Sequence, residues 1–337
     1  MTLSPAIGSQ SLPALLQRAG SRMRLDVHKH SLELATGQAA DPSRRLRGNV
    51  GPLVLIDSRL QRIAARETVQ RSVADLFGTA QTALDKLAGM AGASRDRLIN
   101  VAGLDASSEA LTQAGDTARA GLAGMISALS VAVAGRTVFS GGATDRGPLP
   151  DTDSLLAAVR SHLAGAVTAD DVIAGIEDFF DTPGGAFESA IYAGAASITP
   201  ADTALGVVAA PLPTAADPAI RGMLREAVLA AMLAEPAVIA DLGQRRELAL
   251  RAVGRQAEAT GQLVALRGTL GETEARLDES LIRLGQERDT LLRSRDALIG
   301  VDAFEAASRL EETRARLEAL YMVTARVARL SLTEYLR

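Results

Sequence analysis

Histidine is the residue type in this sequence best suited to acid–base or metal chemistry, and it occurs three times, at His28, His30 and His162. A metal site needs side chains that converge on one point. Because His28 and His30 are two positions apart, a helix would point them about 200° apart. Cysteine is absent from the sequence, which excludes disulfides and thiolate chemistry. We therefore expect no metal site.

Adjacent carboxylates and a glycine-rich segment are the other candidates for chemistry. Asp170–Asp171 and Glu311–Glu312 are sequence neighbours, and neighbours on a helix point about 100° apart, which is typical of solvated faces. The segment GRTVFSGG, residues 135–142, lacks the Gly-Lys-Ser/Thr ending of a phosphate-binding loop. We expect its Val138 and Phe139 to pack inward. The sequence therefore predicts no enzyme and no cofactor.

The charge balance argues against nucleic acid, and the longest apolar segment argues against a membrane. The chain has 36 basic and 40 acidic residues and a net charge of -4, whereas proteins that bind nucleic acid usually carry a basic surface. The most apolar segment, residues 121–135, has 15 residues and is shorter than the ~20 that span a bilayer. We expect neither a nucleic acid nor a membrane as a partner.

The elements that would position any functional residue are helices. Hydrophobic residues make up 47% of the sequence but aromatic residues only 3%, so helix-forming alanine and leucine are prominent. Apolar residues at helical spacing predict an amphipathic helix over residues 12–34. Near the other end, Asp302 and Glu305 have the spacing of a capping box and predict an amphipathic helix that begins near Ala303. Both ends of the chain are therefore expected to be helical.

Longer helices are predicted between these two. One is expected to begin after Gly51-Pro52 and to end in the region 89–92, and another to run from about Ser107 to Ala134. Leucine then recurs at every seventh position from Leu263 to Leu298, which predicts one seam of a helical bundle. The predicted core positions of the bundle are Ile56, Ile63, Phe77, Leu84, Phe139, Leu263, Leu270, Leu277, Leu284, Leu291 and Leu298.

A second heptad series, Gly254, Gly261 and Gly268, falls on roughly the opposite face of the leucine helix. Each glycine costs up to ~1 kcal/mol of helix stability relative to alanine. Two explanations remain open: another helix comes close to this face, or the long helix simply tolerates the glycines.

Residues 145–239 have a different texture, with many turn residues and with the short runs AIYAG and LGVVAA that are compatible with strands. A short helix is predicted there after Asp217, with Pro218 in its first position. The expected fold is mainly α, a long antiparallel helical bundle or coiled coil formed by the N- and C-terminal segments, with a small inserted α+β module. The expected domains are 1–48 with 301–337, 49–144 with 240–300, and 145–239.

The two terminal helices suggest assembly, because an amphipathic helix gains little stability until its apolar stripe is buried. Two such helices pair and still leave apolar surface uncovered. Head-to-tail contacts between copies that do not close build a helical filament or a segment of one. The predicted interface positions are Leu12, Leu16, Met23, Leu34, Leu310, Leu317, Leu320, Tyr321, Val327 and Leu330.

Three segments carry a resemblance to a known family: LATGQAADPSRR, GRTVFSGGATDRGPL and DAFEAASRLEETRARLEALYMVTARVARLSLTEYL. They resemble the bacterial flagellin superfamily over roughly residues 5–145 and 240–337. Within it, GRTVFSG and LSLTEYL are more similar to the hook-associated proteins of the hook-filament junction than to filament flagellin. Only Asp41-Pro42 remains of the usual Asn-Pro-x-Asp-Asp-Pro pattern after the first helix.

The resemblance implies a structural component of the extracellular bacterial flagellum, exported without a cleaved signal peptide by the flagellar type III apparatus. Its terminal helices would form the inner tube of the axial structure. The implied partners are copies of itself, flagellin and another hook-associated protein as axial neighbours, and a flagellar export chaperone. Two alternatives remain, flagellin itself and an unrelated, non-flagellar helical-bundle assembly protein.

Overall fold

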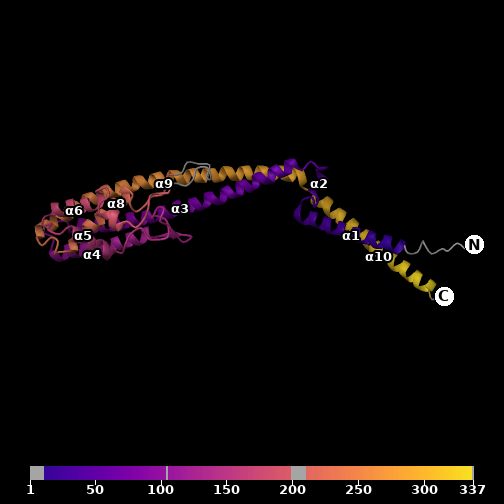
Figure 1. Cartoon of the computed structure of the whole chain (residues 1–337), viewed down its shortest axis with the longest axis horizontal. Helices are drawn as coiled ribbons and strands as arrows, with labels where there is room; N and C mark the ends of the chain where they lie inside the picture. The colour runs from indigo at the N-terminus through magenta and orange to yellow at the C-terminus, as the bar shows by residue number, and fades with distance from the viewer. Residues whose placement is uncertain (1–10, 104, 199–209, 336–337) are drawn as a thin grey trace, which may run out of the picture. The chain divides into compact units, whose positions relative to one another are not determined.

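The structure of the protein is a computed structural model that describes residues 11–103, 105–198 and 210–335, and their side chains from Ala14 to Val327 (Figure 1). The predicted mainly helical bundle fold is confirmed. The chain divides into two compact units, Met1–Ala64 with Leu284–Arg337 (unit 1) and Ala65–Arg283 (unit 2). The three segments expected from the sequence divide the chain differently and stay a prediction.

Unit 1 contains both terminal helices, α1 (Ser11–Thr36) and α10 (Ala303–Tyr335), and the short helix α2 (Pro42–Arg45). It also contains the beginning of α3 (Gly51–Val101) and the end of α9 (Leu242–Ile299). The α10 helix begins at the predicted residue, because the Asp302 carboxylate accepts a hydrogen bond from the Glu305 N–H at 3.0 Å.

Unit 2 holds most of the core, and α4 packs against α8 and α5, while α6 packs against α5 and α8. Three phenylalanine rings meet there, with ring centroids 5.2 Å apart for Phe179–Phe180 and 5.1 Å apart for Phe180–Phe187. Its elements besides α3 and α9 are α4 (Ser108–Leu129), β1 (Ala132–Val133), β2 (Arg136–Thr137), α5 (Thr152–His162), α6 (Ala169–Asp181), the π-helix η1 (Phe187–Ile191), α8 (Pro218–Ala231) and the 3-10 helix η2 (Met232–Ala234).

Side chains at the helix starts account for where the helices of unit 2 begin. Thr168 and Asp171 form a complete capping box at the start of α6. Asp217 caps α8 by accepting a hydrogen bond from the Ala219 N–H at 3.0 Å, with Pro218 in the first turn. The start of α8 therefore confirms its predicted cap.

The long helices α3 and α9 lie side by side through a seam of buried leucines and paired polar side chains. In unit 2, Gln70 donates to Ser280 Oγ at 2.9 Å, and Arg267 reaches Asp85 at 2.9 Å. In unit 1, Arg295 binds Asp57 at 2.9 Å. Among the predicted core positions, Ile56, Leu291 and Leu298 are half-buried, and the buried ones are Ile63, Phe77, Leu84, Phe139, Leu263, Leu270, Leu277 and Leu284.

Two predicted helix ends are wrong. The α3 helix does not stop in the region 89–92 but runs to Val101, because Ala91, Leu98 and Val101 continue its buried stripe while Gly89 and Gly92 lie on the exposed side. The α4 helix ends at Leu129 and not at Ala134, since Ala134 and Gly135 have φ angles of 50° and 78° and form the turn between β1 and β2.

The segment after this turn is the glycine-rich one, residues 135–142. Its backbone meets and hydrogen-bonds a segment that is distant in the sequence, and we call this meeting point the crossing. Val138 and Phe139 are buried, as expected. The backbone beyond them pairs with a distant segment, since the Ala195 N–H donates to Ser140 O at 2.9 Å and the Gly142 N–H donates to Ala196 O at 3.0 Å. Gly141 sits at this crossing with a φ of 57°.

The inserted module differs from the α+β prediction in its strands. The described part of 145–239 contains helices, and most of the run LGVVAA lies outside the described residues. The other run, AIYAG, begins inside η1, where Phe187 and Ile191 are four residues apart and both buried. A helical turn brings such residues to one face, whereas a strand would align them through every second residue.

The three glycines of the heptad series on α9 face open space. A methyl group added at Gly254, Gly261 or Gly268 would have no atom within 4 Å. Within the described residues, therefore, no helix of the same chain comes close to this face.

Candidate assembly interface

The terminal helices α1 and α10 pack against each other (Figure 1), and each carries a series of buried and half-buried residues spaced in steps of four and three. The series on α1 is Leu16, Gly20, Met23 and Val27, and the series on α10 is Ala306, Leu310, Thr313, Leu317 and Leu320. Gly20 is buried, and a methyl group there would lie 3.5 Å from Leu320 Cδ2. This alternation is typical of a two-stranded coiled-coil seam.

A backbone clasp joins the end of α1 to the start of α10. The Ala39 N–H donates to Ile299 O at 2.7 Å, and the Val301 N–H donates to Gly37 O at 2.8 Å. Gly37 adopts a φ of 66°, which glycine reaches without strain and which ends α1. Since Gly20 meets Leu320 while Gly37 meets Val301, the two helices run antiparallel.

Glu33 is the buried charged residue of this clasp. Its carboxylate accepts hydrogen bonds from His30 Nδ1 at 3.0 Å and from the Ala40 N–H at 3.2 Å. Burial by itself would raise the pKa of Glu33, but these hydrogen bonds and the nearby Lys29 charge outweigh it and lower the pKa below its ordinary value. The ionised carboxylate therefore ties the turn after α1 to the helix.

A second set of apolar side chains on the terminal helices stays exposed. Leu25 is 69% exposed on α1, and on α10 Phe304 is 83% and Met322 69% exposed. The other members of this outer row are Leu15, Leu32, Tyr321 and Val323. Seven large apolar side chains that stay exposed on two paired helices favour a further partner for these helices.

The predicted interface positions fall on both surfaces. Leu16, Met23, Leu317, Leu320 and Val327 are half-buried and Leu310 is buried. Leu34 is 38% exposed, and its neighbour Glu33 occupies the buried position. Tyr321 belongs to the outer row. The side chains of Leu12 and Leu330 lie outside the described ones.

The sequence prediction missed most of the outer row. Leu15, Leu25 and Leu32 alternate along α1 with Arg18, Arg22 and Lys29, so they fall on a face that a simple amphipathic division assigns to solvent. Met322 and Val323 directly follow Tyr321, and three consecutive apolar residues cannot all reach one seam. These three consecutive apolar residues were the signal in the sequence that could have revealed the outer row.

The residues considered for chemistry do not converge. His28 is exposed, while His30 turns to Glu33, and His162 Nε2 lies 3.1 Å from Asp178 Oδ2. The described residues contain no group of three or more His, Asp or Glu that could hold a metal ion. Among the described helices, none combines the length and apolarity needed to cross a membrane.

Comparisons with known proteins found one family match and similar solved structures. Residues 254–336, the second part of α9 and α10, match the bacterial flagellin C-terminal helical region. A solved structure of a "putative flagellar hook-associated protein from Vibrio parahaemolyticus" is similar to this chain, with 12% sequence identity and a TM-score of 0.48, over 73% of this chain and 95% of that one. No curated protein matches the sequence.

The family match covers the helix that carries the leucine heptads and the helix that carries the apolar terminal stripe, two of the features from which the resemblance was drawn. The resemblance to the flagellin superfamily is thereby confirmed. Over residues 254–336 the chain is similar to the bacterial flagellin C-terminal helical region, which is the part of the resemblance that a family match supports.

Proposed function

We propose that this protein joins the hook to the filament of the bacterial flagellum, and that copies of it assemble along the axis through α1 and α10. The observation that carries the proposal is the outer row of unit 1. Leu25, Phe304 and Met322 remain mostly exposed after α1 and α10 have paired. Burying such a side chain is worth roughly 1.5–3 kcal/mol, which favours a further partner for this surface.

The identity of that partner follows from the family. Flagellin-like proteins assemble with copies of themselves, so the first partners proposed are other copies of this chain. Flagellin and another hook-associated protein are the proposed axial neighbours, and an export chaperone is proposed to cover the same apolar residues before assembly. The protein would act outside the cell after export by the flagellar type III apparatus.

Within the superfamily, the segments GRTVFSG and LSLTEYL support the junction role over that of filament flagellin. The first of these segments builds the crossing at Gly141. Flagellin itself is the second candidate, since the matched family region is named for flagellin.

A deletion strain separates the two candidates. Loss of a junction protein is expected to leave hooks in place and to release flagellin monomers into the medium. Loss of flagellin is expected to leave hooks with no flagellin to release. Electron microscopy of the cells and immunoblots of the medium read out both results, and normal filaments in the deletion strain would contradict both candidates.

Location gives the direct test. Antibodies against this chain are expected to label a short zone at the distal end of isolated hook-basal bodies that still carry filaments. Labelling along the whole filament would favour flagellin, and no labelling of either structure would contradict a flagellar role.

A further inference from the structure

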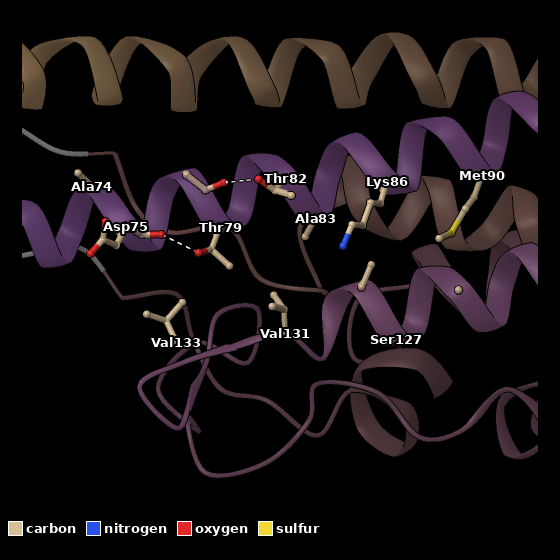
Figure 2. Close-up of a pocket in the computed structure, with 13 residues that line it drawn as sticks. Ala74, Asp75, Thr79, Thr82, Ala83, Lys86, Met90, Ser127, Val131 and Val133 are labelled. Carbon is tan, nitrogen blue, oxygen red and sulfur yellow. Dashed lines mark hydrogen bonds between the residues drawn. The ribbon is translucent and has the colours of Figure 1, made fainter.

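A groove of about 1090 Å³ runs along α3 beside the C-terminal end of α4 and β1 in unit 2 (Figure 2). It extends along α3 from Ala74 to Met90, a length of about 24 Å at a rise of ~1.5 Å per residue. At one end Met90 lies across Gly124, where an added methyl group would come within 2.7 Å of the Met90 sulfur. The groove is therefore long, and the flexible side chain of Met90 lies at one end of it.

The surface of the groove is mostly apolar, although threonines line it. Thr79 Oγ1 donates to the backbone oxygen of Asp75 at 2.7 Å, and Thr82 Oγ1 donates to that of Gly78 at 2.9 Å (Figure 2). Because each hydroxyl is bonded to its own helix, the threonines offer mainly their methyl groups to an occupant. Ala83 and Ala128 add further small apolar surface.

The groove lining contains two charged residues, Asp75 at one end and Lys86 further along α3, and neither makes an ion pair among the described residues. Lys86 is exposed and makes no ion pair among the described residues. Lysine is rare in this protein, which otherwise uses arginine and has only one other lysine, Lys29. An occupant with an apolar face and a carboxylate placed near Lys86, away from Asp75, would match this groove.

The exposed face of α9 has these properties. It consists of six uncharged residues that follow one another in alternating steps of four and three, namely Leu250, Gly254, Ala257, Gly261, Val264 and Gly268. All six are exposed, and Val264 is 58% exposed. From Leu250 to Gly268 this face is about 27 Å long, close to the length of the groove. The three glycines would let another helix approach closely.

A carboxylate lies beside this face. Glu258 is exposed on α9 between Gly254 and Gly261 in the sequence, and it makes no ion pair among the described residues. Nearby carboxylates such as Glu247 and Glu272 are already paired, with Arg251 and Arg276. Glu258 is therefore available to a cation on another molecule, as Lys86 is available to an anion.

We infer that the α3–α4 groove of unit 2 receives the exposed α9 face of a second copy of this chain, with Glu258 of that copy beside Lys86. The inference rests on the proposed function, because it needs copies that assemble. Groove and face are different patches of one molecule, so the contact is head-to-tail and can continue from copy to copy as a ring or a filament.

The small area of the contact indicates that it forms only in the assembled state. A helix face about 27 Å long and 10 Å wide covers on the order of 300 Å² per copy, whereas a stable complex usually buries ~800 Å² per partner. The contact is thus too small to hold a dimer alone and adds to the contacts of the terminal helices in the assembled state.

The absence of cysteine from the chain permits a clean test by disulfide trapping. Two full-length variants, Thr82→Cys in the groove and Gly261→Cys on the α9 face, are mixed, assembled and oxidised. Because each copy carries one thiol, any disulfide joins two copies. The expected result is a disulfide dimer that contains one copy of each variant and is enriched in the assembled fraction.

The matched control replaces Gly261→Cys by Thr269→Cys, an exposed α9 position outside the six-residue face. It is expected to trap at least tenfold less dimer with Thr82→Cys. Assembly without the Thr82–Gly261 dimer, or equal trapping with the control, would overturn the inference and leave the proposed function standing. Trapping in a chain that forms no polymer would support the contact and contradict the proposed function. A failure of the inference can therefore be told apart from a failure of the proposed function.

Exchange of the charges tests the pair itself. Lys86→Glu and Glu258→Lys are each expected to raise the protein concentration needed for assembly about two- to fivefold, and the double variant to restore it. Equal effects that simply add in the double variant would show that Lys86 and Glu258 do not face each other.

Discussion

Individual residues of this protein hold crossings of the chain in place through their backbone conformation and through buried charge. Glu33 illustrates this, since its carboxylate binds both His30 and the Ala40 N–H at the clasp between α1 and α10. Gly141 is another example, because its φ of 57° and its contact with a distant segment leave no room for a side chain. Both residues hold a crossing of the chain in place.

Replacing Glu33→Gln is expected to loosen the clasp by about 1–2 kcal/mol, since a hydrogen bond to a charged acceptor is worth roughly 1.5–3 kcal/mol. The pKa of Glu33 is lowered in the folded state, so its stabilising contribution is complete above the ordinary value of 4.5 and is lost as the pH falls below it. The protection of the Ala40 amide, measured from its exchange rate relative to an unfolded peptide at the same pH, should therefore fall below that pH in the wild type. The variant should show low protection at all pH values, and Glu311→Gln, on the exposed face of α10, should behave as the wild type.

Gly141→Ala is expected to destabilise unit 2 by more than about 2 kcal/mol, because the added methyl group would lie 2.2 Å from Ala195 O. Gly135→Ala is the matched control, since Gly135 also has a positive φ but has no atom within 4 Å of the added methyl group. It should cost only the backbone strain, about 1 kcal/mol. Thermal unfolding of both variants measures the difference, and equal losses would show that the crossing does not matter.

At the scale of elements, α1 and α10 have two apolar surfaces with different roles. The inner seam, which includes Met23 and Leu317, is half-buried by their pairing. The outer row, which includes Leu25 and Met322, is covered by no described part of the chain. The inner seam therefore holds the pair of helices together, while the outer row is proposed to bind other molecules.

Charged substitutions separate these two surfaces. Met322→Glu on the outer row should raise the concentration needed for assembly by more than about tenfold, because burying an unpaired carboxylate in a partner surface costs at least 1.4 kcal/mol. It should leave the helicity of the monomer unchanged by circular dichroism. Thr324→Glu, an exposed polar position two residues away, is the matched control and should assemble nearly as the wild type.

Leu320→Glu on the inner seam should block assembly as well, but by a different route. Leu320 meets Gly20 on α1, so the carboxylate should separate α1 from α10 and reduce the helicity of the monomer. Normal helicity together with lost assembly would show that Leu320 contacts a neighbouring molecule and not α1. A variant that melts as a whole would indicate that the seam belongs to one common core with unit 2.

At the scale of the whole molecule, the two units differ in how much each buries. Unit 2 has a large core from many elements, with fully buried side chains such as Phe180, Leu122 and Leu224. The terminal helices of unit 1 share one narrow seam, in which Leu16 and Leu320 remain half-exposed. Local unfolding costs least where buried apolar contacts are few.

Purified monomer is therefore expected to show fast amide exchange over most of α1 and α10 and slow exchange in α4 and α8. The difference in opening free energy should be at least several kcal/mol, and assembly should remove it by covering the outer row. Mass spectrometry of exchanged peptides measures both states. Equal protection of α10 and α8 in a verified monomer would contradict the proposal that the terminal helices await a partner.

The sequence alone determined the long helices and the caps at Asp217 and Asp302, because heptad and helical periodicity indicate which face of each helix is apolar. It did not determine the end of α3 or the helical form of Phe187–Ile191, since local turn and strand propensities are weaker than burial against neighbouring elements.

The tertiary structure decided which apolar face of each helix packs against the same chain and which stays exposed. Leu263 and Val264 are consecutive, and only packing against the rest of unit 2 buries the first and leaves the second exposed. In the same way, pairing with α10 covers part of Met23 and leaves Leu25 uncovered. Periodicity shows that an apolar face needs a partner, but the choice between an internal and an external partner depends on distances between segments that are far apart in the sequence.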